Sequence, residues 1–428
     1  MTGSQPTEGK EDPSGRGGGT AVENRQRNRV RPLVAAAVGY LFLSLVVWWN
    51  VWSSHPASVT TCGCGDSSLF TWFLEWPAYA LSHGQNPLYS TALFHPTGVN
   101  LLSNTAEVGI GVVLAPVTWL FGPVTTLNVA LTLSPVLSAL AMYVLLARWV
   151  SWSPAAFVGG LLYGFSPYLL LALTDAHLML AMAPFPPLVV ACLDELLVRQ
   201  RRNPVVTGVL LALLVWVQFF IGTEMLVLVA MAAGIGVVVT VVLNVGRIRV
   251  IGRKAGYAIT ATLAAAVTGG VLLAYPIWFA LAGPAHLSGP IWGANSIVAL
   301  GGTNLTDYVF PVLPSAGSTT FAHRFGGYQG LALSQQYLGI GLLVVLAAGL
   351  VIWRRDLRLW LFTAVGATSV LLSSGLQNYW TLWSVVVKLP LMQNVVPSRF
   401  LVVTYLCAAV MLGLIVDHVH RSVDHYRS

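Results

Sequence analysis

Long, uninterrupted apolar runs alternate with short polar stretches along most of this chain. Two of the clearest are LVAAAVGYLFLSLVVWW from Leu33 and VLVAMAAGIGVVVTVVL from Val227. Such runs approach the ~20 apolar residues that cross the hydrocarbon core of a bilayer. Their continuity indicates helices, because the strands of a membrane barrel would alternate apolar and polar residues. The pattern therefore predicts an all-α integral membrane protein.

Basic clusters at the ends of the apolar runs predict the topology. The segment RQRNRVR precedes the first run and places the N-terminus in the cytoplasm by the positive-inside rule. If the later basic clusters are also cytoplasmic, only one of two apolar segments before Arg148 can span. We expect residues 106–121 to lie on the outer membrane surface or to be re-entrant, because this segment is short and contains Pro116.

About ten spanning helices follow, with both termini in the cytoplasm. On this count all but three of the 22 Lys and Arg residues are cytoplasmic. The expected spans lie near 33–52, 127–147, 154–173, 178–197, 205–223, 225–244, 257–280, 336–352, 359–374 and 400–417.

The polar segments complete the expected organisation. Residues 1–32 lack an apolar period and are expected to be a disordered cytoplasmic tail. The membrane domain comprises residues 33–417 and is followed by a cytoplasmic tail, 418–428. Three loops face outwards and carry juxtamembrane helices: 53–126, 281–335 and 375–399.

The composition also indicates a membrane protein, and the placement of the charges argues against a nucleic-acid partner. Only 9% of the residues are charged and the mean hydropathy is +0.74, whereas a soluble domain has about 25% charged residues. The formal charge of +7 does not indicate a nucleic-acid partner, because the cations lie at the ends of apolar runs. Arginine far exceeds lysine, and alanine, valine and glycine are abundant, which is typical of a GC-rich bacterial genome. The expected location is the bacterial plasma membrane.

Asp66 is the first candidate for chemistry. It follows the first spanning helix, and the topology places it outside the cytoplasm. The residues after it, SSLFTWFLEWP, are apolar at helical spacing and predict a surface helix. Asp66 could be the N-cap of this helix, or a general base or metal ligand, and these roles do not exclude one another.

Other ionisable residues lie at outward turns. Asp175 and His177, in TDAHLML, could share a proton or form a polar hairpin turn. Glu224, in FFIGTEML, is closely surrounded by apolar residues, and an ionisable group near the membrane is a candidate for function. The outer acids are Asp66, Glu75, Glu107, Asp175, Glu224 and Asp307.

Cations and histidines on the outer side are candidates for phosphate contacts. Arg399 opens the last span, where it could bind a phosphate with its planar fork of donors or reach lipid headgroups. His323 and Arg324 are a second candidate contact, and His95 lies in the unusual stretch HPTGVNLL. The cysteines of TCGCGD, Cys62 and Cys64, would form a strained ring if bonded to each other, and their role is left open.

The order of these features resembles the membrane-embedded C-class (GT-C) glycosyltransferases. The first loop, GDSSLFTWFLEWPAYALSHGQNPLYSTALFHPTGVNLL, is similar to that of bacterial members of the family. The later stretches LYGFSPYLLLALTDAHL, DYVFPVLP, SQQYLGIG and LPLMQNVVPSRF also resemble family landmarks. The resemblance covers most of residues 33–417. The chain departs from many members because it lacks paired acids at the start of the first loop and a soluble C-terminal domain.

The resemblance implies transfer of a sugar from a polyprenyl-phosphate donor to a glycan, lipid or protein acceptor outside the cytoplasm. The family's first-loop carboxylate acts as a base or metal ligand, and Asp66 occupies the matching position. The resemblance therefore leaves open whether a divalent cation is bound. Arg399 would hold phosphate, and Glu224, Asp175 and His177 would shape the site. Two alternatives remain: a non-catalytic scaffold with membrane protein partners, and a lipid or solute transporter. The transporter is disfavoured because most expected spans are apolar at mid-membrane.

Overall fold

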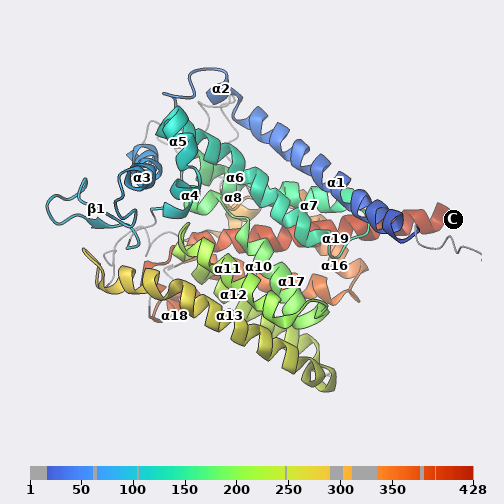
Figure 1. The fold of residues 1–428 in the computed structure, drawn as a ribbon. Coiled ribbons are helices and arrows are strands. Elements are labelled where there is room, and N and C mark those ends of the chain that lie inside the picture. Colours follow the sequence, from blue (N-terminus) through green and yellow to red (C-terminus); the bar gives the residue numbers. More distant parts are fainter. Residues whose placement is uncertain are drawn as a thin grey trace, which may run out of the picture.

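A computed structural model describes residues 17–60, 65–103, 106–245, 248–289, 302–310, 335–375, 380–390 and 392–427 (Figure 1). Helices dominate these residues, and one short antiparallel hairpin pairs Tyr89 with Asn100 and Ser90 with Val99. The elements are α1 Gly17–Val47, α2 Trp49–Trp52, α3 Gly65–Ser82, β1 Tyr89–Ser90, β2 Val99–Asn100, α4 Val108–Val113, α5 Ala115–Phe121, α6 Pro123–Leu146, α7 Ser153–Gly164, α8 Pro167–Thr174, α9 Leu178–Ala181, α10 Phe185–Asp194, η1 Glu195–Arg199, α11 Pro204–Phe219, α12 Thr223–Leu243, α13 Ile248–Ala282, η3 Leu305–Tyr308, α16 Ile340–Ile352, α17 Leu357–Ser373, α18 Trp383–Val386, η4 Met392–Asn394, η5 Pro397–Phe400 and α19 Leu401–Arg427.

The apolar helices support an all-α, multi-pass membrane protein. Among the described residues, six helical segments are long and apolar enough to cross a bilayer, and the bent pair α7–α8 would make a seventh. Three shorter apolar helices, α11, α16 and α17, lie where further spans are expected. The helical segments thus match the positions of the expected spans, while the count of ten crossings stays a prediction.

The segment before α6 is broken into two short helices. α4 has 6 residues and α5 has 7, so each is only about 10 Å long and cannot cross a ~30 Å hydrocarbon core. Leu114 separates them, and Gly122, at φ 83°, separates α5 from α6. This geometry agrees with the expectation that residues 106–121 do not span.

The first helix begins earlier than the sequence suggests. α1 starts at Gly17, within the stretch expected to be disordered. Alanine, glutamate, glutamine and arginine follow, and these residues have favourable or neutral helix propensities. The apolar part of the helix, Val30–Val47, provides the first candidate span.

The helices of the bundle pack closely, and the central helix α19 is mostly buried. Every residue from Leu401 to Met411 on this helix is buried inside the protein. On α7, a side chain at Gly160 would meet the carbonyl oxygen of Ala139 on α6 at 2.7 Å, and it would also meet the Tyr40 hydroxyl of α1. Tyr40 instead donates a 2.8 Å hydrogen bond to the carbonyl of Phe157. Glycine is required here because membrane helices associate through close backbone approach.

The helix bundle has two distinct ends (Figure 1). One end carries α3, α4, α5 and the hairpin, and we call it the loop end. At the opposite end α19 reaches the C-terminus of the chain, and we call this the terminal end. At the loop end, Asn100 Nδ2 donates to the carbonyl oxygens of Phe279 (2.8 Å) and Pro284 (3.1 Å), which ties β2 to the end of α13. At the terminal end, Asp417 Oδ1 accepts from the backbone N–H groups of Ser151 and Trp152.

Candidate functional site

Asp66 lies at the loop end, in the first turn of α3. Phe70, Phe73 and Leu74 are buried on one face of this helix, as its apolar spacing predicts. Because α3 begins at Gly65, Asp66 lies within the helix and is not its N-cap, which was one of the two roles that the sequence left open. A carboxylate in the first turn still interacts favourably with the helix dipole, and its side chain remains 58% exposed.

His177 is the partner of Asp66. Its Nε2 atom lies 3.2 Å from Asp66 Oδ2, and its side chain is 25% exposed. The ring also packs edge-on against Phe70, with centroids 5.6 Å apart. The structure therefore joins two residues that the sequence singled out separately, and an outside molecule can reach their carboxylate.

The turn between α8 and α9 places His177. Asp175 is the C-cap of α8, and His177 precedes the first residue of α9. Between them, the buried Ala176 has φ 60°, a conformation that non-glycine residues rarely adopt. This turn directs the chain so that His177 faces α3.

Glu224 and Arg399 form a second pair at the loop end. Glu224 lies in the first turn of α12, and Arg399 lies in η5. Arg399 Nη1 pairs with Glu224 Oε2, and the side chains are only 21% and 13% exposed. Glu224 Oε1 accepts a 2.8 Å hydrogen bond from the Val396 N–H. The charge of Arg399 is therefore already opposed by a carboxylate, and any phosphate would have to share or replace that partner.

The helix α8 separates the two pairs. Tyr168, near its start, is close enough to Arg399 to interact electrostatically, while its other end leads to His177. With eight residues, α8 is about 12 Å long. None of the four paired side chains lines the cavities found at the terminal end. The expected site residues thus come together as two pairs and not as one cluster.

The remaining expected contacts lie elsewhere. His95 is exposed in the turn between β1 and β2, on a different element from either pair. His323, Arg324, Cys62 and Cys64 lie outside the described residues.

Glu107 is a residue that the sequence reasoning counted among the outer acids but did not assign to the site. It is 2% exposed, precedes α4 and has φ 52°. Its Oε1 accepts a 2.6 Å hydrogen bond from the Met179 N–H on α9. Burial raises the pKa of Glu107 well above its usual range, and the bond from Met179 only partly offsets this. Glu107 thereby anchors the same turn that presents His177.

A signal for Glu107 was present in the chain. It is the only charged residue in the stretch TAEVGIGVVLAP, and an isolated acid beside apolar residues is expected to be buried with a partner or to be functional. The identity of that partner, a backbone N–H of α9, depends on the tertiary fold.

The described residues do not form a metal site with three or more protein ligands. No group of three or more His, Cys, Asp or Glu side chains in the described ranges could hold one. Asp66 and His177 provide two donors, whereas protein metal sites commonly use three or four protein ligands.

Comparisons with protein-family models, with curated proteins and with solved structures find no match to this chain.

Proposed function

We propose that this protein is a membrane glycosyltransferase that uses a polyprenyl-phosphate sugar donor and a cell-envelope acceptor. The observation that carries the proposal is the pair of Asp66 and His177. A carboxylate that is exposed, oriented by an imidazole and placed on a surface helix is suited to remove a proton from a bound hydroxyl group. The loop end would face away from the cytoplasm in the plasma membrane, where lipid-linked donors and envelope acceptors meet.

In the proposed reaction the acceptor oxygen attacks the anomeric carbon of the sugar. The new glycosidic bond forms as the bond from this carbon to the phosphate oxygen breaks, and polyprenyl phosphate leaves with both bonding electrons. The acceptor proton passes to the Asp66 carboxylate, with His177 holding that carboxylate in place. No step requires a metal ion.

The second pair has a supporting role in this proposal. Arg399 would approach the leaving phosphate while remaining bound to Glu224, because the guanidinium group has five N–H donors and one carboxylate does not use them all. Asp175 would contribute by shaping the turn that carries His177.

A non-catalytic scaffold is the second candidate, and one observation favours it. The sequence points to Arg399 as the main candidate to bind phosphate, but in the structure its charge is neutralised by Glu224. A scaffold would use the same pairs to hold α12 against η5 and α3 against the α8–α9 turn. It would act through membrane protein partners in an envelope-synthesis complex.

The two candidates are separated by complementing a strain that lacks this gene. Wild type and Asp66→Asn are expressed at equal membrane levels, and envelope glycans and glycolipids are compared. A transferase predicts that wild type restores a missing sugar and that Asp66→Asn does not. Full restoration by Asp66→Asn would exclude Asp66 as the base and favour the scaffold.

A further inference from the structure

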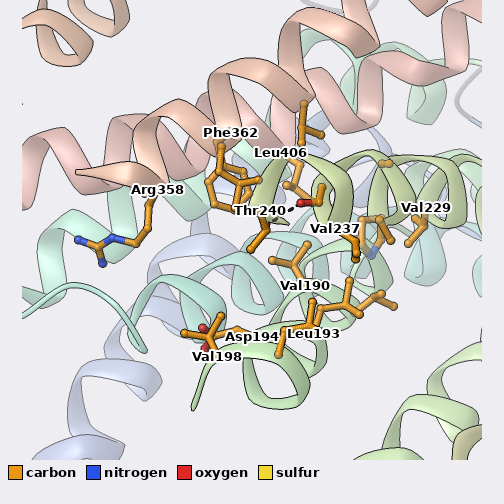
Figure 2. A pocket seen from close by; sticks show the side chains of 18 of the residues that line it. Val190, Leu193, Asp194, Val198, Val229, Val237, Thr240, Arg358, Phe362 and Leu406 are labelled. Atoms are coloured by element: carbon orange, nitrogen blue, oxygen red, sulfur yellow. Dashed lines mark hydrogen bonds between the residues drawn. The ribbon is translucent and has the colours of Figure 1, made fainter. Parts of the chain in front are cut away.

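A large cavity opens among the helices toward the terminal end, and none of the paired residues of the candidate site lines it (Figure 2). Its volume is about 840 Å³, within the range of small-molecule sites. Residues of α10, η1, α12, α17 and α19 form its wall. Most of these residues are valine, leucine, alanine and phenylalanine, so the wall is largely apolar.

The depth of the cavity matches one leaflet of a membrane. Its lining positions on α12 extend from Val229 to Thr240, which is about 16 Å of helix and half of a ~30 Å hydrocarbon core. Val198 and Val237, both in the wall, are 52% and 38% exposed. The cavity is therefore accessible beside apolar surface that lies next to lipid in a membrane-embedded bundle.

Charged residues gather at one end of this cavity. In Figure 2, Arg358 and Asp194 lie toward one side and Val229 lies toward the other. Four arginines belong to the lining, together with a single acid, Asp194. These arginines are Arg148, Arg199, Arg201 and Arg358.

Carboxylates bind three of the four arginines. Asp194 Oδ2 lies 3.0 Å from Arg148 Nε and 2.7 Å from Arg199 Nε. Glu195 Oε2 lies 2.8 Å from Arg148 Nη2. Asp356 Oδ2 lies 2.6 Å from Arg358 Nη2.

Arg201 supplies the excess charge. Its backbone N–H donates to Glu195 Oε1 at 2.6 Å, which fixes the position of the residue. The side chain is exposed, and within the described ranges it has no carboxylate partner. Three carboxylates therefore face four guanidinium groups, which leaves a net charge of about +1 at this end of the cavity.

We propose that this cavity binds an anionic membrane phospholipid. The phosphodiester, which carries one negative charge, would lie against Arg201 and the free donors of the neighbouring arginines, with an acyl chain among the apolar residues of α10, α12 and α17. Basic pockets between membrane helices are known to select anionic headgroups. This inference is independent of the proposed transferase activity.

The test measures lipid binding to the full-length protein purified in detergent. Native mass spectrometry is used to titrate phosphatidylglycerol and phosphatidylcholine, and a phosphatidylglycerol with a diazirine in one acyl chain maps the contact by peptide sequencing. We expect phosphatidylglycerol to bind more tightly than phosphatidylcholine. The diazirine should label peptides from α10, α12 or α17.

Two matched pairs of variants localise the binding. Gly236 lines the cavity, and a side chain there would begin 3.8 Å from Val365 Cγ2, so Gly236→Leu fills the space without a backbone clash. Gly234, on the same helix, has no atom within 4 Å of a Cβ position and does not line the cavity, so Gly234→Leu is its control. Arg201→Gln removes the excess charge, with Arg202→Gln as its control.

Gly236→Leu should abolish acyl-chain labelling, and Arg201→Gln should weaken phosphatidylglycerol binding roughly fivefold. Both controls should behave as wild type, and all four variants should elute as folded protein. Equal losses with Arg201→Gln and Arg202→Gln would overturn the proposal, because they would indicate general attraction to a basic surface. Labelling that persists in Gly236→Leu, or binding of polyprenyl phosphate that phosphatidylglycerol does not displace, would also overturn it.

Discussion

Asp66 and His177 are 111 residues apart in the chain, yet Asp66 Oδ2 lies 3.2 Å from His177 Nε2. This contact joins the surface helix α3 to the turn between α8 and α9. It brings a first-loop carboxylate and an imidazole from a different loop to one accessible place at the loop end.

If Asp66 is the base, His177 should matter less than Asp66 itself. General-base catalysis contributes ~10²–10⁴-fold, so Asp66→Asn should lower the rate of sugar transfer by at least about 10²-fold. His177→Gln removes only the orientation of the carboxylate, and we expect a smaller loss, about tenfold. The rates are compared in membranes that contain equal amounts of each protein.

Glu75→Gln is the control for this comparison, because Glu75 is exposed on the same helix, α3, and has no role in the proposed site. It should retain the wild-type rate. Equal losses from His177→Gln and Asp66→Asn would instead make His177 a direct participant in proton transfer.

The buried Glu107 should make stability depend on pH. Its pKa is raised by burial in the folded protein, so folding favours the protonated form. The stabilisation that protonated Glu107 contributes is therefore fully present below pH about 4.5, the ordinary pKa of an unfolded glutamate. It is lost as the pH rises toward the raised pKa of Glu107 in the folded protein. The steepest slope that one such group can give is about 1.4 kcal/mol per pH unit.

Glu107→Gln should remove this dependence, because glutamine can accept the same bond from Met179 without ionising. Thermal unfolding in detergent from pH 4.5 to 8 would show little difference at the acid end and a growing advantage for the variant above it. Glu75→Gln, at an exposed position on α3, should follow wild type throughout. Parallel curves for wild type and Glu107→Gln would contradict the prediction.

The pair of Glu224 and Arg399 should show strong energetic coupling. Either single change, Glu224→Gln or Arg399→Gln, leaves a mostly buried charge without its partner, at a cost of about 3 kcal/mol. The double variant removes both charges and should recover part of this loss. A double-mutant cycle of unfolding free energies should give a coupling of about 1–3 kcal/mol.

A coupling near zero would mean that the two side chains do not depend on each other. In that case Arg399 would be free to bind phosphate, and the neutralisation that favours the scaffold would lose its basis.

Asp356, at the terminal end, should stabilise the protein down to low pH. Partial burial alone would raise its pKa, but hydrogen bonds from Arg358 and His418 outweigh this and lower the pKa to about 2. The contribution of the Asp356 carboxylate to stability is therefore fully present above pH about 3.8, its ordinary pKa, and is lost as the pH falls through about 2. Asp356→Asn should lower stability at pH 7 by about 1 kcal/mol, and the difference from wild type should vanish near pH 2.

Unfolding measured from pH 7 to 2 checks this expectation. Asp356→Ala should cost about 1 kcal/mol more than Asp356→Asn, because Asp356 Oδ1 also caps α17 through the Arg358 N–H and asparagine can keep that cap. A constant difference between wild type and Asp356→Asn at every pH would contradict the assignment of charge as the cause.

The sequence by itself determined the class of the protein and the positions of its apolar helices. Continuous apolar runs have one low-energy solution in a bilayer, because every backbone polar group must be satisfied within a helix. That constraint is local, so α12 and the membrane segment of α1 could be read from residues alone. The same reasoning indicated that residues 106–121 are too short and too broken to span.

Only the tertiary structure decided which polar groups meet. Asp66 with His177, Glu107 with Met179, and Arg399 with Glu224 are long-range contacts, and no local pattern encodes them. The cavity that Arg201 borders likewise depends on how helices pack, because an apolar face can meet either another helix or lipid at similar cost. Sequence periodicity identifies the faces of helices, whereas complementary packing between distant segments determines the sites.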